Sequence, residues 1–321
     1  MPATVTATQV VRRLSGFAPT GRLQLVHHLG AIRPALEDRA TVDTVIMVAD
    51  LHAMTLEHDP TRLRRLTDEL LATILATGVD PVTSVVYAQS DVPAHAELHY
   101  LLECVCGYNE AAGQTSARPE AALMAADILL HDADEVPAGA GQRPPVEVAR
   151  DVANRFNTRY GRTFVVPQAV SAGLATRRLD LTDPTGRLDR STDPGAGLIF
   201  LLDGPDVVRR KVNQAVTDAD ATVLYDPYRK PGVSNLLDIL AACERDQPDI
   251  AALRFTSYAE LKEAVTDTIV DTLRPIQHSY ARLLADRAYL AEVRRAGADR
   301  AGDRAAITVQ RARAAIGLTT G

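Results

Sequence analysis

Two hydrophobic patterns alternate along the first half of the chain: short apolar runs rich in β-branched residues, and longer stretches with apolar residues at helical spacing. The first pattern is typical of buried strands and the second of amphipathic helices. Strands that alternate with helices predict an α/β fold, with a Rossmann-like parallel sheet and helices on both faces. The predicted strands are residues 12–17, 44–49, 84–88 and 164–166, and the predicted helices are residues 25–36, 60–78, 93–106, 121–130 and 147–160.

Beyond residue 198 the apolar positions follow helical spacing only. The spacing predicts helices at residues 206–216, 233–244, 258–293 with a bend at Pro275, and 299–316. We therefore expect a Rossmann-like domain over residues 1–197 and an all-helical domain over residues 198–294. The C-terminal helix, about residues 295–321, is expected to pack back on the first domain. Two polar, turn-rich segments are candidate active-site loops: residues 137–145 and 183–197.

Composition narrows the class of protein. The chain has 321 residues, 46% of them hydrophobic, which is enough to bury one large core and a smaller one. Because no run of about 18 apolar residues occurs and the N-terminus lacks a signal-peptide pattern, we expect a cytoplasmic protein that does not cross a membrane. The net charge of −6 argues against indiscriminate binding of nucleic acid. Neither a disulfide framework nor a metal site is predicted from the three cysteines, Cys104, Cys106 and Cys243.

Six short strings, in this order and at fitting distances, resemble the tryptophanyl-tRNA synthetase family of class I aminoacyl-tRNA synthetases. The resemblance covers nearly the whole chain and implies a Rossmann-like catalytic domain, a helical anticodon-binding domain and a homodimer. It further implies an aromatic amino acid, ATP with magnesium, and tRNA as ligands. The strings are residues 15–21 (SGFAPTG), 29–31 (LGA), 50–53 (DLHA), 123–129 (LMAADIL), 215–218 (AVTD) and 230–237 (KPGVSNLL).

The resemblance places the amino-acid pocket beside residues 123–129. Asp127 matches the aspartate that accepts the indole N–H, and Met124 and His52 are expected to lie at the same pocket. Gln142 matches a glutamine that contacts the amino end of the substrate. A carboxylate buried in an apolar helix needs a donor, which agrees with this role. Spacing alone leaves open that Asp127 faces the surface and that Met124 is plain core.

The first ATP-handling signature departs from the family pattern. Thr20, Gly21 and Val26 are expected at the nucleotide site, but Val26 stands where the family has a glycine against which the adenine ring lies flat. His27 replaces the family's asparagine and is followed by His28. Two histidines at the start of a helix are candidates for phosphate contact, or are simply exposed.

The second signature, Lys-Met-Ser-Lys-Ser in the family, is Arg-Leu-Asp-Arg-Ser at residues 187–191. Arg187 and Arg190 keep the positive charge that stabilises the leaving pyrophosphate, although a planar guanidinium replaces a compact ammonium, and Ser191 is retained. Asp189 brings a negative charge near the triphosphate, a repulsion of about 1–4 kcal/mol that magnesium would offset. The alternative is an ordinary polar loop.

The departures favour a protein that binds tryptophan or a related indole amino acid and activates or transfers it in a specialised pathway rather than in translation. It would use ATP with magnesium if adenylation survives and no cofactor otherwise. A variant of this hypothesis takes an already charged tRNA as donor, so a role for tRNA is left open. Two alternatives remain: a non-catalytic tryptophan sensor or partner-binding paralogue, and a functional tryptophan–tRNA ligase with unusual motifs.

Overall fold

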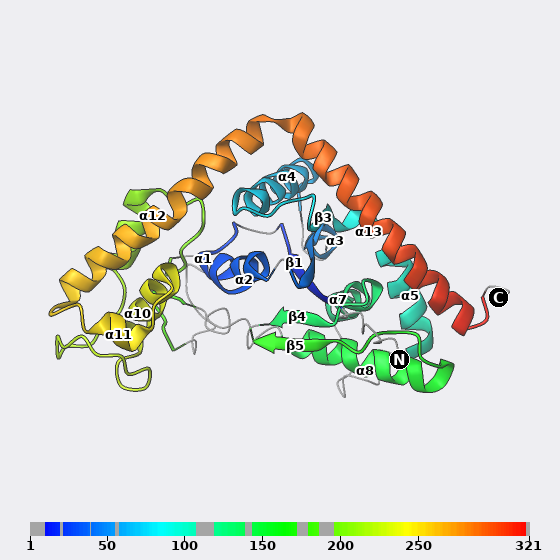
Figure 1. Ribbon diagram of the computed structural model, residues 1–321, viewed down its shortest axis with the longest axis horizontal. Coiled ribbons are helices and arrows are strands. Elements are labelled where there is room, and N and C mark those ends of the chain that lie inside the picture. The colour runs from blue at the N-terminus through cyan, green and yellow to red at the C-terminus, as the bar shows by residue number, and fades with distance from the viewer. Residues whose placement is uncertain are drawn as a thin grey trace, which may run out of the picture.

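The computed structural model describes residues 10–19, 22–38, 40–54, 58–106, 119–138, 143–171, 179–185 and 196–318. Within them, one parallel sheet has the strand order β3-β2-β1-β4-β5 (Figure 1). The order and the parallel pairing confirm the predicted Rossmann-like α/β fold. The strands are β1 (Val11–Phe17), β2 (Val42–Val48), β3 (Val85–Ala88), β4 (Glu135–Ala138) and β5 (Gln168–Ser171).

The last two strands differ from the prediction. Residues 164–166 are not a strand, because the side chain of Asn157 takes the backbone groups of Phe164: Asn157 Oδ1 accepts from its N–H and Asn157 Nδ2 donates to its carbonyl, at 2.9 and 2.8 Å. The strand begins later, at Gln168. Pro137, predicted to lie in a loop, belongs to β4 and pairs with Val170.

Helices cover both faces of the sheet, and the strands alternate between two apolar clusters as their pleat requires. In β2, Val45 and Met47 join the cluster that includes α5, α7 and α8, whereas Ile46 and Val48 join the cluster that includes α1 and α4. The helices of this part are α1 (Leu25–His27), a π-helical turn (His28–Ile32), α2 (Arg33–Glu37), α3 (Asp50–Ala53), α4 (Pro60–Ala76), α5 (Ala94–Cys106), α7 (Pro119–Leu130) and α8 (Arg143–Tyr160).

Every described element beyond residue 200 is a helix, as predicted, but residues 214–230 are irregular, the short helix Pro248–Ala252 was not predicted, and the other helix boundaries differ from the predicted ones. The predicted helix 258–293 is two helices, because α12 continues through Pro275 to Ala285 and the chain turns at Asp286, whose carboxylate caps α13 through the Tyr289 N–H at 3.0 Å (Figure 1). These helices are α9 (Pro205–Asn213), α10 (Pro231–Glu244), α11 (Pro248–Ala252), α12 (Tyr258–Ala285) and α13 (Arg287–Ala315).

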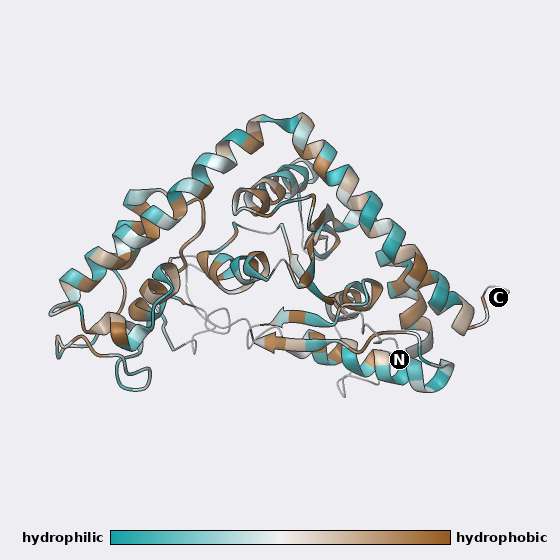
Figure 2. Ribbon diagram, in the orientation of Figure 1, coloured by the Kyte–Doolittle hydropathy of each residue, from teal (hydrophilic) through white to brown (hydrophobic). Residues whose placement is uncertain are grey.

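The helical region shares a core with one face of the sheet. Leu25 of α1, Leu71 of α4, Leu236 of α10 and Ile269 of α12 belong to one buried apolar cluster. Apolar residues accordingly dominate α10, while α12 and α13 mix polar and apolar positions (Figure 2). The division into domains at residue 197 stays a prediction. Among the described helices, none combines the length and apolar character needed to cross a membrane.

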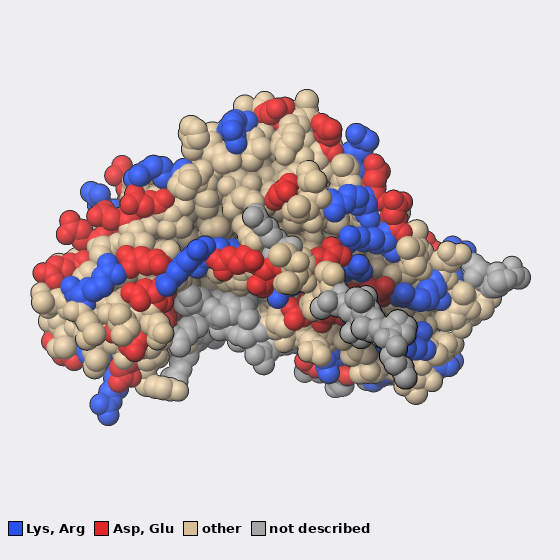
Figure 3. Space-filling model, in the orientation of Figure 1, with Lys and Arg blue, Asp and Glu red and all other residues tan. Residues whose placement is uncertain are grey.

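The last helix lies along β3 and α5, next to the sheet (Figure 1). Its arginines form ion pairs with acids of the sheet region. Basic and acidic side chains are mixed along this side of the molecule (Figure 3). The pairs are Arg294–Asp91, Arg304–Asp43, Arg311–Asp132 and Arg313–Glu97.

Candidate amino-acid and nucleotide site

Polar side chains gather where β2 and β3 end, at the carboxyl edge of the sheet. Asp50 begins α3 directly after β2, and Gln89 begins a 3-10 helix (Gln89–Asp91) directly after β3. The Asp50 carboxylate accepts hydrogen bonds from the Ser90 N–H and hydroxyl at 2.8 and 2.6 Å, which ties the two strand ends together. Ligands of open α/β sheets bind at this edge.

Asp127 of α7 lies at the centre of this group and is only 1% exposed. Its Oδ1 is 2.6 Å from His95 Nδ1, its Oδ2 is 2.8 Å from His52 Nε2, and Gln89 Nε2 donates to both oxygens at 2.8 and 2.9 Å. Burial alone raises the pKa of the carboxyl, but attraction to His95 and the hydrogen bonds with His52 and His95 outweigh burial, so the pKa lies well below its ordinary value. The structure therefore places an ionised carboxylate in the core.

Two of the predicted pocket residues, Asp127 and His52, thus lie in direct contact. Met124 lies one helical turn before Asp127. It is partly buried and packs against the apolar cluster that includes α5, α7 and α8. The surface-facing alternative for Asp127 is wrong. The roles of these side chains toward a ligand stay predictions.

Sequence reasoning missed Gln89 and His95. Gln89 directly follows the predicted strand 84–88 and His95 lies at the start of the next helix, α5, and polar residues beyond the end of a parallel strand are the positions from which site residues are drawn. That signal, together with the need of Asp127 for donors, could have identified them.

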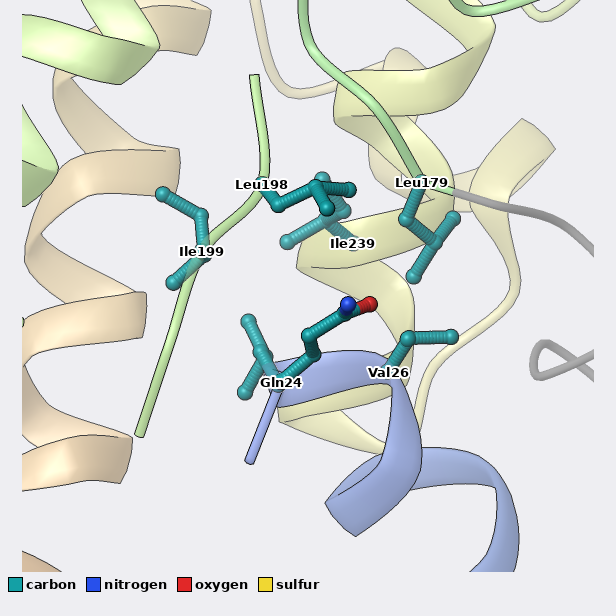
Figure 4. Close-up of a pocket in the computed structure, with 7 residues that line it drawn as sticks. Gln24, Val26, Leu179, Leu198, Ile199 and Ile239 are labelled. Atoms are coloured by element: carbon teal, nitrogen blue, oxygen red, sulfur yellow. The ribbon is translucent and has the colours of Figure 1, made fainter. Parts of the chain in front are cut away.

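A small hollow lies between α1, the segment around Ile199, and α10 (Figure 4). The Leu25 N–H donates to the Ile199 carbonyl at 2.8 Å, which fixes that segment to the start of α1. The side chains of Gln24 and Val26 point from α1 toward Leu179 and Ile239 (Figure 4). The lining is otherwise apolar and comprises Gln24, Leu25, Val26, Leu179, Leu198, Ile199 and Ile239.

The surroundings of the adjacent histidines, His27 and His28, differ from those of two solvent-exposed rings. His27 Nδ1 accepts from the Gln24 N–H at 3.4 Å, and burial lowers the His27 pKa. His28 is buried, and burial, followed by the charge of Arg33, lowers its pKa to about 4. The exposed alternative is therefore wrong for His28, and both rings are uncharged at neutral pH. Phosphate contact by His27 stays a prediction.

Several predicted site residues lie outside the described residues, and the structure neither supports nor contradicts their roles. Within the described ranges, no group of three or more His, Cys, Asp or Glu side chains is arranged to hold a metal ion. The predicted residues outside the description are Thr20, Gly21, Gln142, Arg187, Asp189, Arg190 and Ser191.

Comparison with known proteins identifies the family. The family model of "tRNA synthetases class I (W and Y)" matches residues 6–117 and 121–274. The "Tryptophan--tRNA ligase 1" of Streptomyces coelicolor is 44% identical, over 96% of this chain and 98% of its own length. The tryptophan–tRNA ligase of Leifsonia xyli is 42% identical, over 97% and 98%.

Two solved structures extend the likeness to the fold. The tryptophanyl-tRNA synthetase of Mycoplasma pneumoniae is 29% identical with a TM-score of 0.86, over 97% of this chain and 98% of that one. The enzyme of Campylobacter jejuni, solved in complex with ADP and tryptophan, is 25% identical with a TM-score of 0.72, over 96% and 100%. A family model that matches most of the chain, relatives of this identity over nearly its full length, and the carboxylate site at the sheet edge agree: the chain belongs to the tryptophanyl-tRNA synthetase family of class I aminoacyl-tRNA synthetases.

Proposed function

We propose that this protein is a tryptophan–tRNA ligase that binds tryptophan beside Asp127, activates it with ATP and transfers it to tRNA. The observation that carries the proposal is the buried Asp127 carboxylate at the carboxyl edge of the sheet, in hydrogen-bond contact with His52, His95 and Gln89. Near-full-length relatives named as tryptophan–tRNA ligases support the same activity.

The Asp127 carboxylate suits an indole ring because a carboxylate oxygen can accept the ring N–H. A hydrogen bond to a charged acceptor contributes about 1.5–3 kcal/mol. The His95 side chain is fully buried, whereas 11% of the His52 side chain is exposed. Tryptophan therefore approaches the carboxylate from the His52 side, with Met124 along the ring and Gln142 at the amino group.

In this proposal, the adenine ring of ATP lies in the hollow beside Val26. The apolar lining is of the kind that contacts the face of an aromatic base, and the Gln24 amide is the polar group beside it, but the free space is about that of one water molecule, so adenine enters only if the hollow widens. The tryptophan carboxylate then attacks the α-phosphorus and pyrophosphate leaves, with Arg187 and Arg190 supplying positive charge. Magnesium would enter on the phosphates of ATP, since Mg²⁺ is often held through substrate phosphates and few carboxylates.

Relatives named as ligases support this proposal better than the repurposed enzyme that the motif departures suggested. One observation favours a second candidate, a tryptophan-binding protein without adenylation: the Val26 side chain occupies part of the hollow. The homodimer, and tRNA binding by residues 198–294, remain part of the proposal.

The test is tryptophan-dependent ATP–pyrophosphate exchange, run beside a tryptophan titration and charging of tRNA with labelled tryptophan. The chain contains no tryptophan, so indole fluorescence in the titration comes from the ligand alone. Exchange with charging supports the ligase, and tyrosine and phenylalanine serve as controls for selectivity. Binding without exchange supports the second candidate, exchange without charging revives the repurposed enzyme, and the absence of both binding and exchange overturns the proposal.

A further inference from the structure

Behind the amino-acid site, the Tyr87 hydroxyl lies between two histidine rings. It is 2.9 Å from His95 Nε2 and 2.6 Å from His131 Nε2. Because His95 Nδ1 faces Asp127, the four side chains form one continuous hydrogen-bonded chain. All four are at most 1% exposed, so water does not substitute for any of these contacts.

The donor and acceptor groups in this hydrogen-bonded chain determine which atom donates and which accepts at each contact. An ionised Asp127 only accepts, so His95 Nδ1 carries a hydrogen, and His95 Nε2 is left to face the Tyr87 hydroxyl. A hydroxyl has one hydrogen and can also accept, so Tyr87 serves both rings at once. Both nitrogens of His95 are thereby engaged, and its ring is fixed at two ends.

His131, which directly follows α7, lies at the far end of this hydrogen-bonded chain. Its pKa is lowered to about 3, mainly by burial and further by the charges of His95, Arg12 and Arg304, so the ring is neutral. Its Nδ1 has no partner among the described residues. Its backbone carbonyl accepts from Arg12 at 2.9 Å, which anchors the position of the ring.

A core chosen for packing alone would not require this arrangement. Three polar rings lose their hydration on burial, and one of them keeps an unpaired nitrogen, so apolar side chains of similar size would be at least as stable there. The hydrogen-bonded chain ends at Asp127, the group proposed to accept the indole N–H of the substrate. A polar network of this kind fixes orientation rather than adding stability.

We propose that Tyr87 and His131 are positioning residues of the amino-acid site, which hold the ring of His95, and through it the Asp127 carboxylate, in the orientation that accepts the ring N–H of the substrate. This inference rests on the proposed binding of tryptophan at Asp127. Asp127 Oδ2 faces His52, on the side from which the ligand is proposed to enter, and Oδ1 faces His95 on the buried side.

The first test is Tyr87→Phe, which removes the hydroxyl and keeps the ring. The expected result is a dissociation constant for tryptophan about 5–30-fold higher, since a buried hydrogen bond is lost, with kcat of exchange changed less than about threefold. The matched control is Tyr225→Phe, which removes a hydroxyl that donates to Asp238 at 3.0 Å in the helical region. The control should leave the tryptophan affinity unchanged. An unchanged affinity in Tyr87→Phe overturns the proposal.

The second test compares His131→Leu with His131→Gln. Leucine cannot bond the Tyr87 hydroxyl, so tryptophan affinity should fall about 2–5-fold, whereas glutamine keeps a polar partner and should restore most of the affinity. Equal affinities in the two variants count against the proposal. This pair also decides the question if Tyr87→Phe does not fold.

A third measurement separates failure of this inference from failure of the proposed function. Side-chain ¹⁵N spectra of His95, recorded on the free protein, report its tautomer and hydrogen bonding without any ligand. The expected result is a shift in Tyr87→Phe and none in Tyr225→Phe. If the wild-type protein binds no tryptophan, the proposed function fails, and unchanged His95 signals in Tyr87→Phe would overturn the positioning role as well.

Discussion

Gly297 of α13 lies against the backbone carbonyl of Val86 in β3, so closely that a Cβ at residue 297 would be 1.8 Å from that oxygen. Since β3 is the outermost strand in the described order, α13 covers an edge that would otherwise expose unpaired backbone groups. The close approach of helix and strand therefore depends on the absence of a side chain at residue 297.

Gly297→Ala should lower the free energy of unfolding, because the clash with a backbone atom forces α13 away from β3. Overpacking of this kind costs about 1–3 kcal/mol, and urea unfolding measures it. Gly302→Ala is the control on the same helix, with no atom within 4 Å of the added Cβ. It should stabilise the protein by about 0.5–1 kcal/mol, as alanine does in a helix interior. Equal behaviour of the two variants would contradict the close packing.

The sheet could be predicted from the sequence because β2 and β3 are apolar runs whose pattern no local contact disturbs. The pattern failed at residues 164–166, where the Asn157 side chain takes the hydrogen bonds that a strand would make. It also failed at the corner between α12 and α13, because the pattern places the break at Pro275, whereas the boundary signal is the N-cap residue Asp286. Whether a side chain takes the hydrogen bonds of a backbone segment in this way depends on the three-dimensional structure.

The candidate site was predictable in part. Asp127 and His52 could be assigned from the family strings, and their contact at 2.8 Å agrees with a common site. The deeper partners, His95, Tyr87 and His131, come from three separate elements, and no spacing in the sequence joins them. Only the fold brings these rings together.

Asp127→Asn should weaken tryptophan binding by about 1.5–3 kcal/mol, because the acceptor of the indole N–H loses its charge. The indole-fluorescence titration measures the change. Asp203→Asn is the control, since Asp203 is a similarly buried carboxylate, paired with Lys211 at 2.7 Å. That variant should lose stability but keep its tryptophan affinity. Equal affinity in Asp127→Asn and the wild-type protein would remove Asp127 from the pocket.

Val26→Gly should lower the KM for ATP in the exchange reaction, because it clears the space in which the adenine ring is placed. A change on the order of tenfold corresponds to about 1.4 kcal/mol. The KM for ATP of Val26→Ala should lie between those of the wild-type protein and Val26→Gly, since this change removes only part of the side chain. A KM that does not decrease from valine to alanine to glycine would place the adenine elsewhere.

Stability should fall as the pH is lowered from about 6.5 toward 4, because His28 and His131 are buried uncharged and burial also lowers the pKa of His27. The pKa of His28 is lowered to about 4 and that of His131 to about 3, whereas both rings have a pKa of about 6.5 in the unfolded chain. In this window the unfolded state binds more protons than the folded state, so protonation favours unfolding. Each ring contributes a slope of about 1 kcal/mol per pH unit, which vanishes above about pH 7, where both states are neutral.

His28→Gln should reduce this slope by about 1 kcal/mol per pH unit, because the His28 ring no longer titrates. Urea unfolding at about pH 5 and about pH 7.5 measures the difference, and both values lie above the range in which carboxylates dominate. His278→Gln, on an exposed position of α12, is the matched control and should leave the slope as in the wild-type protein. A slope that His28→Gln does not change would mean that the His28 ring accepts its proton in the folded state as readily as in the unfolded chain, contrary to its burial.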